Sequence, residues 1–304
     1  MPHLDAVSLT IIIVGLIVCA CAVVLITMHP KPARKRRADK ARLKSCALGN
    51  LLDISRGETQ TGEVMTNVSG FDVAVSFAKD IGARQEQQDA FGAYQDENRL
   101  LLTVCDGMGG MAMGAESSMT AVNEVKSVFM RDKSGNALIN AIKNANSKVY
   151  DLCRGKGGST CVAAVIDKNG LSYASVGDSR IYIYRKGVLK QLGQDHIFLY
   201  DLLENAHRIG ISAQEAYEHP EREHLTSFIG RETLGRVNKN DEPISLFGGD
   251  IILMFTDGVY KTIDEDEIVS LLESGAEAKD IVSGVLARKK QRQDNLTVIK
   301  VRIL

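Results

Sequence analysis

Short apolar runs alternate with polar segments along residues 71–303, and this pattern predicts a series of β-strands. The predicted strands cover 71–77, 100–104, 161–166, 171–176, 181–184, 188–192, 251–255 and 296–303. Asn169-Gly170 and Arg185-Lys186-Gly187 stand between consecutive runs, where they predict tight hairpin turns. Strands joined by such turns pair antiparallel, so the pattern favours antiparallel sheets.

Apolar residues spaced three and four positions apart predict helices over 115–130, 138–152, 267–272 and 278–286. Ser212 and Glu215 have the spacing of a capping box, which predicts a short helix within the otherwise irregular stretch 195–224. Hairpin-linked strands interleaved with paired helices predict an α+β fold, in which helices cover the outer faces of antiparallel sheets.

A charge-free apolar segment lies near the N-terminus, over residues 8–28. As a helix, its 21 residues would extend about 31 Å, which matches the hydrocarbon thickness of a bilayer. A cleaved signal peptide would place positive charge before a shorter apolar core, and residues 1–7 contain no Lys or Arg. We therefore predict one transmembrane helix, preceded by a short extracytoplasmic tail of residues 1–7.

Eight Lys and Arg residues and one Asp lie between positions 31 and 44. By the positive-inside rule, this cluster predicts a single-pass protein of the cell membrane whose C-terminal body is cytoplasmic. We interpret residues 29–68 as a basic juxtamembrane segment and a flexible tether, because the chain from Cys46 onward is polar and lacks a clear period. One domain is predicted over 69–304.

Charge and cysteine content narrow the function of this domain. Residues 45–304 carry 29 basic and 36 acidic side chains, a net charge of −7. An acidic body is repelled by phosphate backbones, which argues against nucleic acid as a partner. The six cysteines include no Cys-x-x-Cys pair, so buried thiols in a reducing compartment are favoured over a disulfide framework or a zinc site.

Aspartates stand at the ends of several predicted strands. Asp106 and Asp257 each follow a buried-type strand and precede a glycine, Asp178 ends another strand, and Asp294 opens the last one. If they converge, they need a cation, because two carboxylates 4 Å apart repel by about 4 kcal/mol at an effective dielectric constant of 20. Oxygen ligands alone favour Mg²⁺ or Mn²⁺. An isolated Asp-Gly pair is otherwise typical of a surface turn.

Eight short motifs follow one another along the domain. They are Arg84-x-x-Gln-Gln-Asp89, Asp106-Gly-Met-Gly-Gly110, Gly158-Ser-Thr160, Gly177-Asp-Ser-Arg180, Asp195-His196, Leu225-Thr-Ser-Phe-Ile-Gly230, Thr256-Asp-Gly258 and Asp294-Asn-Leu-Thr297. In this order, the motifs resemble the PP2C-type (PPM family) metal-dependent serine/threonine protein phosphatases of the bacterial style, over residues from about 71 to 304. The resemblance implies a four-layer α-β-β-α sandwich of two antiparallel sheets, and hydrolysis of phosphoserine and phosphothreonine.

The resemblance also implies roles for individual residues. It implies two Mn²⁺ or Mg²⁺ ions bridged by Asp106, with the Gly107 carbonyl on one ion and Asp257 and Asp294 on the other. The nucleophile it implies is a dimetal-bound hydroxide, available at neutral pH because metal ions lower the pKa of water. Arg84 matches the residue that binds the phosphate group, which suits its planar guanidinium.

The outer positions of the implied site depart from the family. Asp89 matches an acid that holds metal-bound water, but Gln88 replaces the usual Glu before it and predicts weaker binding of one ion. Met108 stands where animal enzymes have a proposed general acid, so water or the substrate must protonate the leaving group. Lys261 replaces an acid that binds a third ion together with the residue at Asp178. This exchange puts the third ion in question and leaves Asp178 a structural role.

Residues 197–224 resemble the flap of the family, a variable segment beside the cleft that contributes to substrate choice. The preceding His196 is interpreted as a packing or capping residue. Phosphoproteins are the predicted partners. By analogy of fold alone, an anchored phosphatase could oppose a membrane-bound Ser/Thr kinase or act on its targets.

Three other roles were weighed against this one. A purely structural membrane-anchored domain would leave the aspartates at the strand ends unexplained. A phosphatase with an aspartate nucleophile requires Asp-x-Asp, and the residues two positions after Asp106 and Asp257 are Met108 and Val259. A catalytically weak phosphoprotein-binding sensor or scaffold on the same fold is the remaining alternative, motivated by Gln88 and Lys261.

Overall fold

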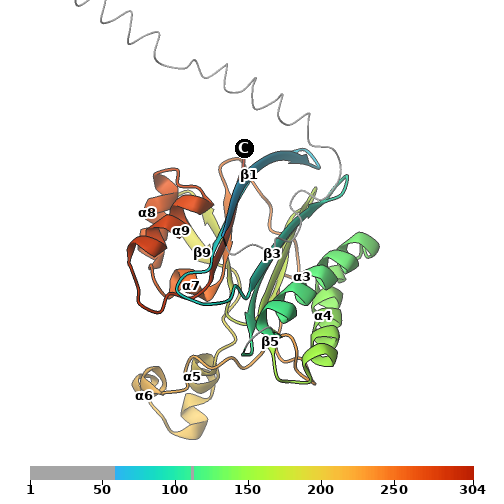
Figure 1. Ribbon diagram of the computed structural model, residues 1–304. Coiled ribbons are helices and arrows are strands. Elements are labelled where there is room, and N and C mark those ends of the chain that lie inside the picture. The colour runs from blue at the N-terminus through green and yellow to red at the C-terminus, as the bar shows by residue number, and fades with distance from the viewer. Residues whose placement is uncertain (1–58, 111–112) are drawn as a thin grey trace, which may run out of the picture. The chain divides into compact units, whose positions relative to one another are not determined.

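The computed structural model describes residues 59–110 and 113–304, and within them two antiparallel sheets face each other (Figure 1). The first sheet has the order β1 (Gln60–Val68), β2 (Phe71–Asp80), β12 (Leu296–Ile303), β11 (Ile251–Phe255), β8 (Arg180–Arg185) and β9 (Val188–Gln191). The second has the order β10 (Asn238–Lys239), β7 (Gly170–Val176), β6 (Cys161–Asp167), β4 (Leu100–Met108) and β3 (Asp89–Gln95), and β5 (Gly158–Ser159) also pairs with β4.

Helices cover the outer face of each sheet. The pair α3 (Met113–Arg131) and α4 (Ala137–Cys153) packs on the second sheet. The single turn α7 (Asp257–Tyr260) and the helices α8 (Glu265–Glu273) and α9 (Ala278–Ala287) pack on the first. Two further helices, α5 (Phe198–Ile209) and α6 (Ala213–Glu218), project from these layers at the lower left of Figure 1.

Three apolar clusters lie between the four layers. One fills the space between the sheets, where the Phe77 and Phe91 rings are 5.1 Å apart. The second lies between the second sheet and α3 and α4, and the third between the first sheet and α7 to α9. Because strand residues alternate between faces, Leu100 and Leu102 join the central cluster while Leu101 joins the one under α3. The predicted arrangement of two antiparallel sheets flanked by helices is confirmed.

All eight predicted strands and all four predicted long helices are present, often a few residues longer than expected. Ser212 caps α6 as predicted: its hydroxyl accepts from the Glu215 amide, and the Glu215 carboxylate accepts from the Ser212 amide. Helix α5 occupies part of the stretch that was predicted to be irregular. Its apolar residues Phe198, Leu202 and Ile209 recur at helical spacing, so the signal for this helix was present in the sequence and was missed.

The predicted tether is wrong for its last nine residues. Gln60–Val68 form β1, which pairs with β2 along its whole length and extends the predicted domain toward the N-terminus. This edge strand is made largely of polar and partly exposed residues, so it lacks a clear apolar period. Strand β3 was also missed, because small residues such as Ala90, Gly92 and Ala93 interrupt its apolar pattern.

The predicted tail 1–7, membrane span 8–28 and basic segment with the first part of the tether lie outside the described residues. Within the described ranges 59–110 and 113–304, no helix is both long enough and apolar enough to cross a bilayer.

Candidate active site

The aspartates predicted at strand ends gather around a single cavity of about 800 Å³. Strands of both sheets end there, so residues far apart in the sequence line one pocket. Of the predicted site residues, the lining includes Arg84, Gln88, Asp106, Gly107, Asp178, Asp257 and Asp294. Asp89 does not line the cavity; it is buried beside it, with 3 % of its surface exposed.

The backbone at Asp106 is held from two sides. Its N–H donates to the Thr160 hydroxyl at 2.9 Å, and its carbonyl accepts from the Thr160 N–H at 2.8 Å. At Gly107, an added Cβ would lie 2.0 Å from the Gly114 carbonyl oxygen, so only glycine allows α3 to approach β4 this closely. The chain therefore fixes Asp106 and Gly107 at the cavity wall.

The first sheet contributes Asp257 and Asp294 from adjacent strand ends. Asp257 lies two residues after β11 and opens α7, whereas Asp294 lies two residues before β12. A Cβ on Gly258 would lie 2.0 Å from the Asn295 carbonyl oxygen, so the two segments are in close backbone contact. The Asn295 side chain also accepts from the Gln88 N–H at 2.8 Å, which ties this corner to the second sheet.

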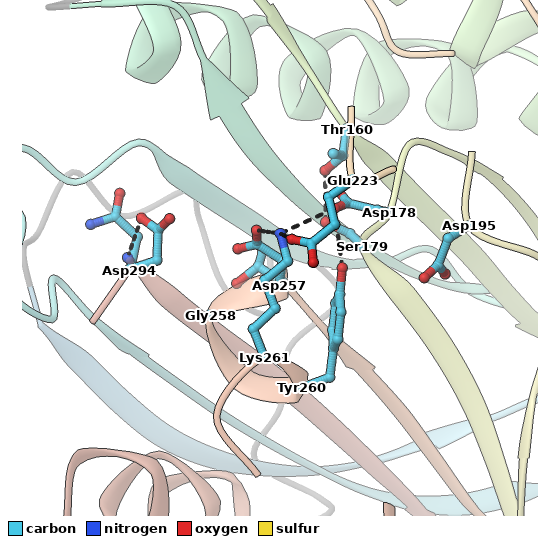
Figure 2. A network of polar contacts seen from close by, with 12 residues as sticks. Thr160, Asp178, Ser179, Asp195, Glu223, Asp257, Gly258, Tyr260, Lys261 and Asp294 are labelled. Carbon is cyan, nitrogen blue, oxygen red and sulfur yellow. Dashed lines mark hydrogen bonds and ion pairs between the residues drawn. The ribbon is translucent and has the colours of Figure 1, made fainter. Parts of the chain in front are cut away.

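Two cations pair with these carboxylates. An Arg84 Nη donates to Asp294 Oδ2 at 2.5 Å, and Lys261 Nζ donates to Asp257 Oδ2 at 2.7 Å. Lys261 Nζ also lies 3.8 Å from Asp178 and 3.9 Å from Glu223 (Figure 2). With Asp257 and Asp294 turned toward these cations, the described part of the chain has no group of three His, Cys, Asp or Glu side chains already arranged around one metal position.

Asp89 lies behind the cavity in a polar niche. Its Oδ2 accepts hydrogen bonds from the hydroxyls of Thr256 and Thr297, each at 2.8 Å. Among the described residues, Asp89 Oδ1 and Asp257 Oδ1 are both buried and have no hydrogen-bond partner. Burial, followed by the charges of Asp257 and Asp294, raises the pKa of Asp89 to about 7 despite the two hydroxyl donors.

Burial and neighbouring carboxylates also raise the pKa values of Asp106 and Asp178. Withdrawal from water, then the charges of Asp89 and Asp257, raise the pKa of Asp106 well above its ordinary value. Burial and Asp257 raise the pKa of Asp178 to about 6, although Lys261 opposes the shift. Acids that repel one another in this way keep their charge only beside cations. The donor set, with two unpartnered carboxylate oxygens, therefore fits a hard divalent ion.

Asp178 is held by Tyr260 of α7. The Tyr260 hydroxyl donates to Asp178 Oδ2 at 3.1 Å (Figure 2). The Arg180 guanidinium stacks on the Tyr260 ring, with its central carbon 3.5 Å from the ring centroid. Arg180 in turn forms a bidentate pair with Asp195, because its Nε donates to Oδ1 at 3.2 Å and an Nη donates to Oδ2 at 2.7 Å. Tyr260 was missed from the sequence, although it lies one position before the Lys261 that attracted attention.

His196 packs beside this turn, in agreement with its interpretation. It is 6 % exposed, and its Nδ1 accepts from the Gly177 N–H at 3.0 Å, immediately before Asp178. Burial lowers the pKa of His196, so the neutral ring that this hydrogen bond requires is favoured. Glu223, which reaches the cavity from the flap, had no signal in the sequence because it lies in a polar stretch without a period.

Comparison with known proteins identifies the family of this chain. A family model described as Protein phosphatase 2C matches residues 78–290. The chain belongs to the protein phosphatase 2C family. The serine/threonine phosphatase stp of Listeria welshimeri is 26% identical over 233 residues, which cover 72% of this chain and 90% of the relative.

Solved structures agree with the protein phosphatase 2C assignment. The serine/threonine phosphatase of S. agalactiae superposes with a TM-score of 0.67 at 24% identity, over 76% of this chain and 100% of that chain, and supports the fold. The PPM Ser-Thr phosphatase MsPP of Mycobacterium smegmatis has a TM-score of 0.60 at 29% identity, over 76% and 98%. The enzyme class predicted from the sequence, a serine/threonine phosphatase, is confirmed.

Proposed function

We propose that this protein hydrolyses phosphoserine and phosphothreonine in phosphoproteins, with two Mn²⁺ or Mg²⁺ ions, at the cytoplasmic face of a cell membrane. One observation carries the catalytic part of the proposal: four aspartates from the ends of both sheets meet at one cavity, with Arg84 at its wall, in a protein phosphatase 2C domain. A phosphoryl group carries negative charge, so a pocket of aspartates accepts it only when cations are present.

The residues that would hold the ions are Asp106, the Gly107 carbonyl, Asp257 and Asp294. Two features support this set: the free, buried Oδ1 of Asp257, and the mutual repulsion that raises the pKa of Asp106. When bound, divalent ions supply Lewis-acid chemistry and make hydroxide available at neutral pH. Asp89 would orient water from behind Asp106 through its own free Oδ1.

Arg84 would bind and orient the phosphate group. Its side chain is 56 % exposed and pairs with Asp294 at the edge of the cavity, so the guanidinium can reach both the solvent and the site. A planar guanidinium donates two parallel hydrogen bonds to two phosphoryl oxygens. Met108 and Gln88 offer no acid to the leaving group, so the proton that it requires would come from water or from the substrate.

Membrane attachment is a separate part of the proposal. It is supported by the charge-free segment 8–28 and by the basic cluster that follows it, which together match a span with its C-terminal side in the cytoplasm. The test is carbonate extraction of membranes from cells that express the chain, together with protease treatment of intact spheroplasts. Recovery in the soluble fraction, or cleavage of the domain from outside, would overturn the topology.

The catalytic proposal is tested on the full chain, purified in detergent, with a phosphothreonine peptide and Mn²⁺. The wild type should release phosphate only with metal, whereas Asp106→Asn and Asp257→Asn should lose turnover. Asp241→Asn serves as the matched control, because Asp241 is exposed and pairs with the nearby Lys239. A wild type that binds the phosphopeptide without metal-dependent turnover would instead favour the sensor or scaffold, the alternative suggested by Gln88 and Lys261.

A further inference from the structure

Lys261 occupies a position that is unusual for a lysine. Its ammonium contacts carboxylates from three separate segments: Asp257 at 2.7 Å, Asp178 at 3.8 Å and Glu223 at 3.9 Å. Asp257 opens α7, Asp178 follows β7, and Glu223 belongs to the flap segment 197–224. Figure 2 shows the three carboxylates directed toward one nitrogen.

The geometry resembles that of a cation with oxygen ligands. An ammonium is a compact positive charge with three N–H donors, and here three anionic groups surround it. The Asp178 and Asp257 side chains are only 8 % and 15 % exposed, so water screens their repulsion poorly. Lys261 follows Asp257 by four residues on one helical turn, the order in which an acid and a lysine pair best.

We propose that Lys261 is a positioning residue whose ammonium acts as a permanent cation between Asp178, Asp257 and Glu223, where a divalent ion would otherwise bind. Tyr260 completes the arrangement, since its hydroxyl donates to Asp178 from the same turn. The contact between Lys261 and Glu223 also ties the flap to the wall of the cavity. In this way the chain supplies one cation of its pocket itself, at a fixed place and without dependence on the metal supply.

The number of ions bound per chain measures this directly. The full chain in detergent is dialysed against Mn²⁺, and the bound Mn²⁺ per chain is measured by inductively coupled plasma mass spectrometry. Lys261→Ser should bind one more Mn²⁺ per chain than the wild type, and Lys261→Ser combined with Asp178→Asn should lose that ion again. Lys239→Ser is the control, because Lys239 pairs with the exposed Asp241. An unchanged count in Lys261→Ser would overturn the proposal.

A second variant tests the same idea without removing the lysine. If Lys261 and not a metal ion lies at Asp178, then Asp178→Asn should leave the Mn²⁺ count of the otherwise wild-type chain unchanged. Loss of one ion in this variant would contradict the proposal even if Lys261→Ser failed to fold.

The flap contact has its own readout in hydrogen exchange. Glu223→Gln should speed amide exchange over residues 219–225 several-fold, and adding Lys261→Ser should speed it no further. Equal exchange in Glu223→Gln and wild type would remove the flap from the proposal.

The inference rests on the proposed function only in that the pocket takes up divalent ions. A wild type that binds no Mn²⁺ would therefore reject the metal-dependent function, whereas bound Mn²⁺ with unchanged counts in the variants would reject only the role of Lys261.

Discussion

Asp89 and Asp106 lie directly opposite each other on the paired strands β3 and β4. Directly opposed residues in an antiparallel pair point to the same face, so like charges at these positions destabilise the sheet. Two threonine hydroxyls offset part of this cost at Asp89. The remaining repulsion is the physical reason why this edge of the sandwich is suited to cations.

The first prediction concerns the pH dependence of stability without metal. The pKa of Asp89 rises from 3.8 to about 7 on folding, so the folded state holds a proton that the unfolded state has released. The free energy of unfolding should therefore fall as the pH rises from about 4 to 7, by at most on the order of 4 kcal/mol from this group. Urea denaturation in EDTA at pH 5.5 and pH 8 measures the change.

Asp89→Asn is the matched variant, because it keeps the shape of the side chain but cannot ionise. It should be more stable than the wild type at pH 8 and should flatten the pH dependence. Mn²⁺ should restore stability to the wild type at pH 8, since it favours the ionised carboxylates. An equal slope in the variant would assign the pH dependence to other groups.

The second prediction concerns the close backbone contact at Gly107. Gly107→Ala places a Cβ 2.0 Å from the Gly114 carbonyl oxygen, so β4 or α3 must shift. We expect a loss of about 1–3 kcal/mol in stability, together with weaker Mn²⁺ binding, because the Gly107 carbonyl moves with the strand. Gly135→Ala is the control, since no described atom lies within 4 Å of its added Cβ. Isothermal titration with Mn²⁺ and thermal unfolding together distinguish a local shift from global loss of structure.

The third prediction tests whether Arg84 recognises the phosphate group through its planar fork. Arg84→Lys keeps the charge but loses the two parallel donors, so kcat/KM for a phosphopeptide should fall about 10-fold or more. Arg288→Lys is the control, because Arg288 pairs with Glu267 at an exposed position away from the cavity. Retention of full activity in Arg84→Lys would mean that only its charge matters.

The fourth prediction concerns the buried pair of Arg180 and Asp195. The Asp195 side chain is 3 % exposed, so Arg180→Met leaves a buried carboxylate without its ion pair, although the Gln191 amide still donates to it, and should cost about 3–5 kcal/mol. Arg154→Met should change stability by less than about 0.5 kcal/mol, because both partners of the Arg154–Asp151 pair are 71% exposed. Chemical denaturation of the two variants checks the difference. Equal stability of the two variants would contradict the structural role of Arg180.

Much of the architecture follows from the order of residues alone. Apolar runs such as Leu100–Val104, followed by the Asp-Gly pairs at Asp106 and Asp257, predict buried strands that carry an aspartate near their ends. Strand ends of antiparallel sheets meet at shared edges, so the convergence of the aspartates could be expected. Local patterns were insufficient where burial is partial, as in β1, or where small residues dilute the period, as in β3.

Only the tertiary structure decided which charges face one another. Sequence spacing does not predict that Lys261 lies near Glu223, or that Asp89 accepts hydrogen bonds from Thr256 and Thr297. These partners are 38 to 208 positions apart in the chain. The sequence by itself determined the layers, the enzyme family and the aspartates of the pocket. The pairing of those aspartates with Arg84 and Lys261, and the raised pKa of Asp89, depend on distances and burial that exist only once both sheets have packed.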